Sequence, residues 1–407
     1  MKNRRKKNYR IDTEIVLQPV DHQNPGGETF PQRVKLLIPD GMAPEPTVFF
    51  VLGNESAVSD ESVTRLYRAY GCRRDLLIIL AEHRGYGQSL TADGDQSVPR
   101  YVTVRQALAD YHRIADTYRN RFGGRWIAAG YSYGGGLVIH YGALYPGDAD
   151  VLLSSSGVVD WPYLLDSYEG QVKENLGGEL YSRLIRHVDR LTPAVPFGKS
   201  WRARELLYAM ITGVSQYEQN HTRLLGLFRL LAKLPTRLFM GALRLLDRVF
   251  AASAASDYVN SNSKCTLSRE EALSGRFSWR VWRYQQFTET GTCWHSADPS
   301  GLYRYKPEDW AWECELLFGI KPTVLQKESW DVRSMVPKLR VPLVYVCGGR
   351  DPWKTVCLPR DYPLTKGRIL YFDNAFHCPD RDAAYGSQVI GALLDMIEVT
   401  QENSSQH

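Results

Sequence analysis

Residues 126–140 read WIAAGYSYGGGLVIH, where a short apolar run leads into Gly-Tyr-Ser-Tyr-Gly and then into an apolar, helix-compatible segment. This G-x-S-x-G pattern is typical of a strand-to-helix elbow that carries a nucleophilic serine at its apex. Gly130 and Gly134 would let two backbone segments pass closely. The helix start would direct free N–H groups at an oxyanion formed beside Ser132. An incidental serine in a glycine-rich turn is the alternative when the pattern stands alone.

Short, continuous apolar runs lie on both sides of the elbow and predict buried β-strands. The clearest runs, each ending at a polar or glycine-rich turn, are residues 34–39, 47–52, 76–81, 151–155, 341–347 and 367–372. Such strands suit a parallel sheet that is covered on both faces. Helical spacing over residues 102–122 adds a β–α alternation. We therefore expect an α/β-hydrolase fold, a doubly wound and mostly parallel sheet.

The strand rhythm is interrupted after residue 160 and resumes after Pro337. Helical patterns dominate the interval, over residues 163–191, 201–214, 221–250 and 307–318. We expect a helical cap over residues 161–333, inserted into a hydrolase core of residues 11–160 and 334–407. The pattern over 224–250 is amphipathic and basic. It predicts a packed cap helix that is kinked at Pro235 and has a solvated face, with binding to a membrane surface as the alternative.

The bulk composition is that of a soluble globular enzyme, with 407 residues of which 43% are hydrophobic and 23% charged. Residues 1–10 carry six Lys or Arg and no acid, so they account for the net charge of +5. We expect them to form a disordered tail rather than a nucleic-acid-binding arm. No run of about 18 apolar residues predicts a transmembrane helix. Residues 8–13 are polar, which argues against a signal peptide and for a cytoplasmic protein.

The sequence lacks the usual signatures of metal and cofactor sites. Its seven cysteines show no C-x-x-C spacing, so we expect no structural zinc, while one or two disulfides among Cys265, Cys293 and Cys314 stay open. No glycine-rich phosphate loop or dinucleotide fingerprint is found, and we expect no cofactor. The oligomeric state stays open as well.

Three predicted strand ends carry Ser132, Asp351 and His377, which is the chain order of the α/β-hydrolase triad. The histidine would take the serine proton, and the aspartate would fix the histidine tautomer. Asp373 is a rival acid, but it shares the strand end of His377, whereas Asp351 follows the preceding strand. For the oxyanion hole we expect the N–H of Tyr133 and one from the loop after residues 47–52. That second donor would be Asn54 or Glu55.

Several separated motifs resemble the prolyl carboxypeptidase and dipeptidyl peptidase II family of serine peptidases, and the related prolyl tripeptidyl aminopeptidases of actinobacteria. The matching motifs are Asp21-His22-x-Asn24-Pro25, Gly53-Asn54-Glu55, Glu82-His83-Arg84-x-Tyr86-Gly87, Gly130-Tyr131-Ser132-Tyr133-Gly134-Gly135, Tyr284-Gln285-x-x-Thr288-Glu289 and Asp351-Pro352-Trp353. The chain departs from the family at Phe287, where the family has cysteine, and in the loop that follows His377. The resemblance implies secretion if the true start lies upstream.

The resemblance implies a serine exopeptidase that acts on short peptides and releases N-terminal di- or tripeptides with a preference for proline. The α-ammonium of such a substrate needs a carboxylate, for which Glu289 is the first candidate and Glu55 the second. Gln285, in the same motif as Glu289, is a further candidate for binding the substrate, and Trp353 would supply a flat wall for a proline ring. The alternatives are a proline-iminopeptidase-like aminopeptidase or a carboxylesterase or lipase on the same fold. A non-catalytic binding protein on a hydrolase scaffold is the alternative of another class.

Overall fold

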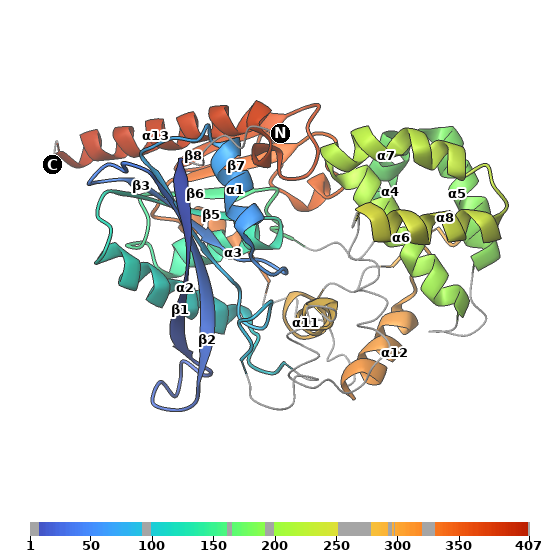
Figure 1. The fold of residues 1–407 in the computed structure, drawn as a ribbon, viewed down its shortest axis with the longest axis horizontal. Coiled ribbons are helices and arrows are strands. Elements are labelled where there is room, and N and C mark those ends of the chain that lie inside the picture. The colour runs from blue at the N-terminus through green and yellow to red at the C-terminus, as the bar shows by residue number, and fades with distance from the viewer. Residues whose placement is uncertain are drawn as a thin grey trace, which may run out of the picture.

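A twisted, mostly parallel sheet forms the centre of the protein in this computed structural model, which describes residues 8–91, 99–160, 165–191, 199–250, 278–291, 295–296, 298–319 and 330–405 (Figure 1). Its strands are β1 (Tyr9–Pro19), β2 (Thr29–Pro39), β3 (Thr47–Leu52), β4 (Leu76–Ala81), β5 (Arg125–Tyr131), β6 (Val151–Ser155), β7 (Leu343–Gly348) and β8 (Gly367–Phe372). The spatial order is β1-β2-β4-β3-β5-β6-β7-β8. Strands β3 to β8 pair in parallel, while β2 is antiparallel to both β1 and β4. This arrangement confirms the predicted α/β-hydrolase fold.

Helices cover both faces of this sheet. On one face α2 (Val104–Arg119) and α3 (Tyr133–Leu144) pack into an apolar cluster with the strands. On the other face α1 (Asp60–Ala69) and α13 (Ala383–Ser405) do the same. Because both faces are covered, every residue of β3, β4, β6 and β7 is buried. Their continuous apolar runs follow from this.

The first strand begins earlier than the sequence predicts. Residues 1–10 are expected to form a disordered tail, yet β1 starts at Tyr9, whose partner in β2 is Pro39. Arg10 is therefore part of the strand, and its guanidinium lies 3.1 Å from the Asp12 carboxylate. The earlier residues 1–7 lie outside the described part of the chain.

A group of helices lies between β6 and β7 in the chain, within the range predicted for the cap. They are α4 (Asp166–Leu176), α5 (Gly178–Leu191), α6 (Lys199–Gln216), α7 (Glu218–Leu231), α8 (Thr236–Phe250), α11 (Ser278–Gln285) and α12 (Pro307–Phe318), and a π-helical turn (Gln286–Thr290) follows α11. Helices α4 to α8 form a lobe beside the sheet (Figure 1), with an apolar cluster of their own. We call these five helices the helical lobe. The cap boundaries at residues 161 and 333 stay a prediction.

Two predicted helices are each divided in the structure. The pattern over 221–250, expected to be one helix with a kink, forms α7 and α8, because Pro235 lacks the N–H that a continuous helix needs. The pattern over 163–191 is divided at Gly177, whose φ of +84° favours glycine. Within the described ranges, no helix is both long and apolar enough to cross a membrane. Cys265 and Cys293, two of the three candidates for disulfides, lie outside those ranges.

Candidate active site

Ser132 lies at the apex of a tight turn between β5 and α3. Its φ of 56° and ψ of −121° fall in a region that non-glycine residues rarely adopt. The turn is closed so tightly that a Cβ on Gly130 would lie 1.9 Å from the Gly134 carbonyl oxygen. The Ser132 N–H donates to the Ser155 carbonyl at 2.9 Å, which fixes the turn against β6. The sequence therefore folds into the expected elbow.

His377 and Asp351 form a buried hydrogen-bonded pair. Nδ1 of His377 lies 2.7 Å from Oδ2 of Asp351, and the other oxygen of Asp351 accepts the Trp353 N–H at 2.9 Å. Burial acts to lower the pKa of His377, but the Asp351 carboxylate outweighs it and holds the pKa well above its usual value. Nε2 of His377 is buried and has no hydrogen-bond partner among the described residues. That nitrogen is the one that a catalytic histidine presents to its serine.

The loops that carry Ser132 and His377 meet at the end of β6. The N–H of Cys378, which follows the histidine, donates to the Ser156 hydroxyl at 2.9 Å. Ser132 is bonded to the preceding residue, Ser155. The chain thus brings the three strand ends to the carboxyl edge of the sheet. The rival acid Asp373 is exposed and pairs instead with Arg360, at 3.1 Å.

The expected oxyanion donors surround the start of α3. Tyr133 is the first residue of that helix, a position whose N–H has no partner within the helix. The loop after β3 lies beside it, since a Cβ on Gly134 would be 3.5 Å from the Asn54 Cβ. Glu55, in the same loop, has one buried carboxylate oxygen that no described residue hydrogen-bonds, and burial raises the pKa of this group. The oxyanion roles of Tyr133, Asn54 and Glu55 stay predictions.

Gln285 connects α11 to the elbow. Its Nε2 donates to the Tyr133 hydroxyl at 3.0 Å, and its Oε1 accepts from the Tyr86 hydroxyl at 2.5 Å. Because both ends of the amide contact protein groups, Gln285 holds the motif of residues 284–289 against Tyr133, the residue that follows the serine. A direct contact between Gln285 and a substrate stays a prediction.

Glu289 lies in the π-helical turn after α11 and is half-buried. One of its oxygens accepts the N–H of Val104, the first residue of α2, at 3.0 Å. A carboxylate is favourable at such a helix N-terminus. Burial raises the pKa of Glu289, and burial together with the charge of Glu289 raises the pKa of Tyr133. Glu289 therefore lies within electrostatic reach of the elbow, while its role toward a substrate ammonium stays a prediction.

Gln216, at the end of α6, contacts two parts of the site and was not anticipated from the sequence. Its backbone carbonyl accepts the N–H of His377 at 3.1 Å. Its side-chain oxygen accepts the indole N–H of Trp353 at 3.1 Å. The half-buried Trp353 ring also packs on Tyr168 of α4, with ring centroids 4.4 Å apart. The helical lobe therefore holds both the histidine loop and the tryptophan beside the acid.

Asp380 is the second group that sequence reasoning missed. It is fully buried, and its two oxygens accept from the hydroxyls of Tyr70, at 2.6 Å, and Ser155. Tyr70 also bonds the Tyr131 hydroxyl at 2.6 Å. Burial raises the pKa of Asp380. The network joins the histidine loop to the residue before Ser132, and its only signal in the sequence is an acid three residues after His377.

No group of His, Cys, Asp and Glu side chains in the part of the chain that the structure describes could hold a metal ion.

Residues 18–182 match the family described as Serine carboxypeptidase S28. This match confirms the resemblance predicted from the motifs. A prolyl tri/tetrapeptidyl aminopeptidase of Streptomyces mobaraensis is 29% identical over 184 residues, which are 45% of this chain and 36% of that relative. The chain thus matches little more than a third of the relative's length.

Two solved structures match nearly the whole chain at low sequence identity. A proline iminopeptidase of Mycobacterium smegmatis is 12% identical, with a TM-score of 0.47 over 95% of this chain and 100% of that one. A peroxisomal alpha-beta-hydrolase of Saccharomyces cerevisiae is 9% identical, with a TM-score of 0.42 over 99% of this chain and 91% of that one. The fold assignment rests on the sheet order of this chain.

Proposed function

We propose that this protein is a serine exopeptidase in which Ser132 is the nucleophile, His377 the general base and Asp351 the group that orients the histidine. The observation that carries the proposal is the geometry of His377. Its Nδ1 is hydrogen-bonded to Asp351, while its buried Nε2 has no partner among the described residues. The histidine lies at the same edge of the sheet as the strained turn that carries Ser132.

The reaction would proceed through an acyl-enzyme. The Ser132 oxygen attacks the scissile carbonyl carbon as its proton passes to Nε2 of His377. The N–H groups at Tyr133 and at the Asn54 loop would stabilise the oxyanion. Collapse breaks the C–N bond, and the proton on Nε2 passes to the leaving amine. A water molecule then loses its proton to Nε2, attacks the ester carbonyl and releases the acid, and Ser132 regains its proton.

The substrates would be short peptides with a free amine, from which the enzyme releases N-terminal di- or tripeptides after proline. Support comes from the matching relative, which is a prolyl tri/tetrapeptidyl aminopeptidase. Further support comes from two partly buried carboxylates whose pKa values are raised by burial, Glu289 and Glu55. A bound ammonium would compensate the cost of burying such a charge.

The nucleophile is tested with a fluorophosphonate probe and the Ser132→Ala variant. The parent protein should be labelled and the variant should not. Turnover of Ala-Ala-Pro and Ala-Pro amides should fall in the variant to a residual rate about 10³–10⁴ times that of the reaction in water. Ser182→Ala, on the exposed surface of α5, is the matched control. Labelling that persists in Ser132→Ala contradicts the proposal.

The carboxylate is tested with Glu289→Gln and Glu55→Gln on free and N-blocked peptides. Loss of an ammonium ligand should raise KM for free-amine substrates by about tenfold or more, because charge-assisted hydrogen bonds contribute about 1.5–3 kcal/mol. N-blocked substrates should change little. An equal loss on both kinds of substrate would assign the residue a structural role, and a parent enzyme that prefers blocked peptides with a free C-terminus would indicate a carboxypeptidase.

A further inference from the structure

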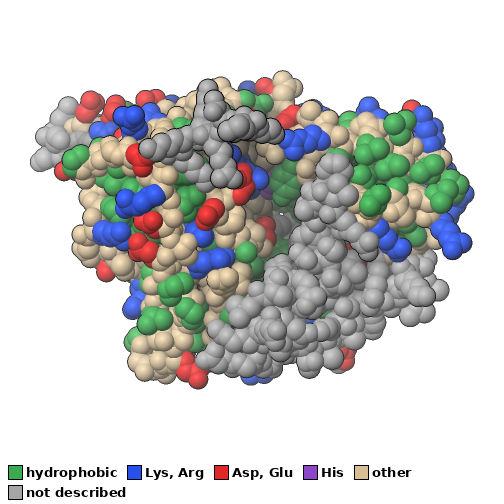
Figure 2. Space-filling view, in the orientation of Figure 1, with side chains coloured by type: hydrophobic (Ala, Val, Ile, Leu, Met, Phe, Trp, Pro, Cys, Tyr) green, Lys and Arg blue, Asp and Glu red, His purple; other side chains and the backbone are tan. Residues whose placement is uncertain are grey.

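Exposed leucines are concentrated on the α7–α8 hairpin of the helical lobe. Eleven large hydrophobic side chains are exposed in the described part of the chain, and five of them lie here: Leu227, Leu230, Leu234, Leu238 and Leu245. We call these five the leucine patch. Leu230, Leu238 and Leu245 are each at least 60% exposed. Leu227 and Leu230 are three residues apart in α7, and Leu238 and Leu245 are seven apart in α8, so each pair lies on one side of its helix. Leu234 lies in the turn between the two helices. Figure 2 shows hydrophobic side chains gathered over the lobe with Lys and Arg at its edges.

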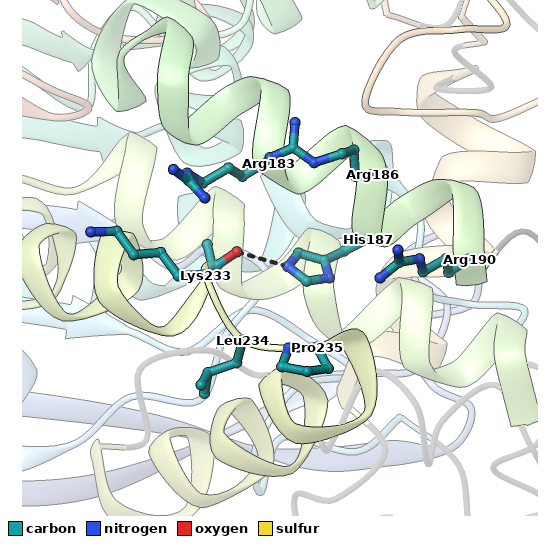
Figure 3. A pocket seen from close by; sticks show the side chains of 8 residues that line it. Arg183, Arg186, His187, Arg190, Lys233, Leu234 and Pro235 are labelled. Atoms are coloured by element: carbon teal, nitrogen blue, oxygen red, sulfur yellow. Dashed lines mark hydrogen bonds between the residues drawn. The ribbon is translucent and has the colours of Figure 1, made fainter.

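A basic pocket opens beside this patch. It has a volume of about 400 Å³ and lies between α5 and the turn that joins α7 to α8. Its charged side chains are Arg183, Arg186, Arg190 and Lys233, and Leu234 of the leucine patch lines it too (Figure 3). The pocket and the patch therefore form one continuous surface.

Few acids offset these cations. Arg183 pairs with Glu179 at 2.7 Å. This contact lowers the pKa of Glu179, and the charges of Lys233 and Arg229 lower it further. The other acid of α5, Asp189, pairs with Arg304 instead. The range 218–250 contains six Lys or Arg and two Asp or Glu. The surface therefore keeps an excess of positive charge.

His187 also lines the pocket, and both of its ring nitrogens are engaged in contacts with the protein. It therefore offers no free acceptor to the cations around it. His187 is buried, with Nδ1 2.9 Å from the Thr236 hydroxyl and Nε2 3.1 Å from the Ala232 carbonyl. The two ring nitrogens thus contact both sides of the turn, Ala232 at the end of α7 and Thr236 at the start of α8. These contacts fix the turn that presents Lys233 and Leu234 (Figure 3).

We propose that the basic pocket and the leucine patch together dock the protein onto a membrane surface that contains anionic phospholipids. Leucines of this hairpin would enter the boundary between headgroups and acyl chains, and the four cations of the pocket would contact lipid phosphates and carboxylates. An amphipathic helical surface with basic residues around an apolar face binds membranes in this way. In this arrangement the helical lobe lies on the membrane surface.

The charge pattern favours a lipid surface over the other occupants of an apolar face. A second copy that docked through the same patch about a two-fold axis would oppose cations to cations. Nucleic acid would use the cations but would leave the leucines exposed. Only an anionic surface with an apolar interior satisfies both groups of side chains.

The test is co-sedimentation of the full chain with vesicles of phosphatidylcholine alone or with about 30% phosphatidylserine. The protein should sediment with the anionic vesicles and be released as salt rises from about 0.1 to about 0.5 M. Lys233→Glu and Arg186→Glu should each weaken binding fivefold or more, at about fivefold per lost charge. Leu230→Ser and Leu238→Ser should each weaken it by about tenfold.

Leu17→Ser on β1 and Arg113→Glu on α2 are matched controls, since both side chains are exposed and lie outside the helical lobe. Both should bind like the parent, and all variants should keep the parent's unfolding temperature. Equal binding to vesicles without phosphatidylserine, or no effect of the four lobe variants, overturns the proposal. So does binding to duplex DNA as tight as that to the anionic vesicles at the same salt, or a dimer that Leu230→Ser dissociates. Vesicle binding does not depend on the peptidase proposal, which has its own readout in probe labelling.

Discussion

Asp351→Asn tests the arrangement of the site most directly, because the structure determines how the new amide must lie. One oxygen of Asp351 accepts the backbone N–H of Trp353 and the other contacts Nδ1 of His377. If the Asn oxygen keeps the Trp353 contact, its NH₂ group faces Nδ1, and the histidine must carry its proton on Nε2. In the opposite orientation the Asn NH₂ group would face the backbone N–H of Trp353, and two donors without an acceptor cost about 1–3 kcal/mol. The inactive tautomer therefore dominates.

The expected loss in kcat is about 10⁴-fold, the effect of the same change in other serine triads, which corresponds to about 5 kcal/mol in the activation barrier. The carboxylate also raises the pKa of His377. Since the base must be neutral to act, removing that charge should move the acidic limb of the pH profile to lower pH. Both effects are read from kcat and kcat/KM for a tripeptide amide between about pH 4 and 9.

Asp373→Asn is the matched control, because it alters the rival acid at the adjacent strand end. Asp373 is exposed and contacts Arg360, and surface pairs of this kind contribute about 0–1 kcal/mol. This variant should keep its rate within about twofold. A loss in Asp373→Asn as large as that in Asp351→Asn, or an unchanged acidic limb in the latter, would refute the reasoning.

Three further variants test the surroundings of the site. Gly130→Ala places a Cβ 1.9 Å from the Gly134 carbonyl oxygen. It should abolish probe labelling and lower the unfolding free energy by about 3 kcal/mol or more. In the control Gly147→Ala the new Cβ meets no described atom within 4 Å, so both readouts should stay unchanged. Asp380→Asn should lower kcat about tenfold with KM unchanged, because the buried acid positions the loops on both sides of the elbow, and it should destabilise by about 1–3 kcal/mol in urea unfolding; an unchanged kcat would contradict this positioning role. Burial raises the pKa of Glu313 to about 7, so the parent should lose stability from about pH 4.5 through about pH 7. As pH rises, the unfolding free energy of the parent should therefore fall relative to that of Glu313→Gln. Unfolding free energies that change in parallel with pH in the two proteins would contradict this expectation.

The sequence predicted the features that depend on short, local patterns. Continuous apolar runs marked the strands because a sheet covered on both faces buries every residue of a strand. Strand-end positions led to Ser132, Asp351 and His377, because parallel strands bring such loops to one edge. The contact of His377 with Asp351 follows that expectation.

Features that depend on contacts distant in sequence could not be predicted. Gln216 ends an amphipathic helix like many others, and nothing local indicates that its carbonyl bonds the histidine backbone. Asp380 had a signal only in its distance from His377, since its partners Tyr70 and Ser155 lie hundreds of residues away in the chain. The start of β1 at Tyr9 was missed because pairing with Pro39 outweighs a basic, polar composition. Local charge was thus a poor guide to where the first strand begins.

The bond from Gln216 to His377 has a consequence for protein engineering. In a hydrolase whose insertion only covers the site, that insertion can be exchanged for another to change specificity. Here the exchange would also remove an anchor of His377, the proposed general base, and the partner of the Trp353 indole. A chimaera that retains the end of α6 should therefore keep its rate more readily than one cut at the sheet edge. With the roles proposed for His377 and Trp353, turnover and selectivity would be coupled through the end of α6.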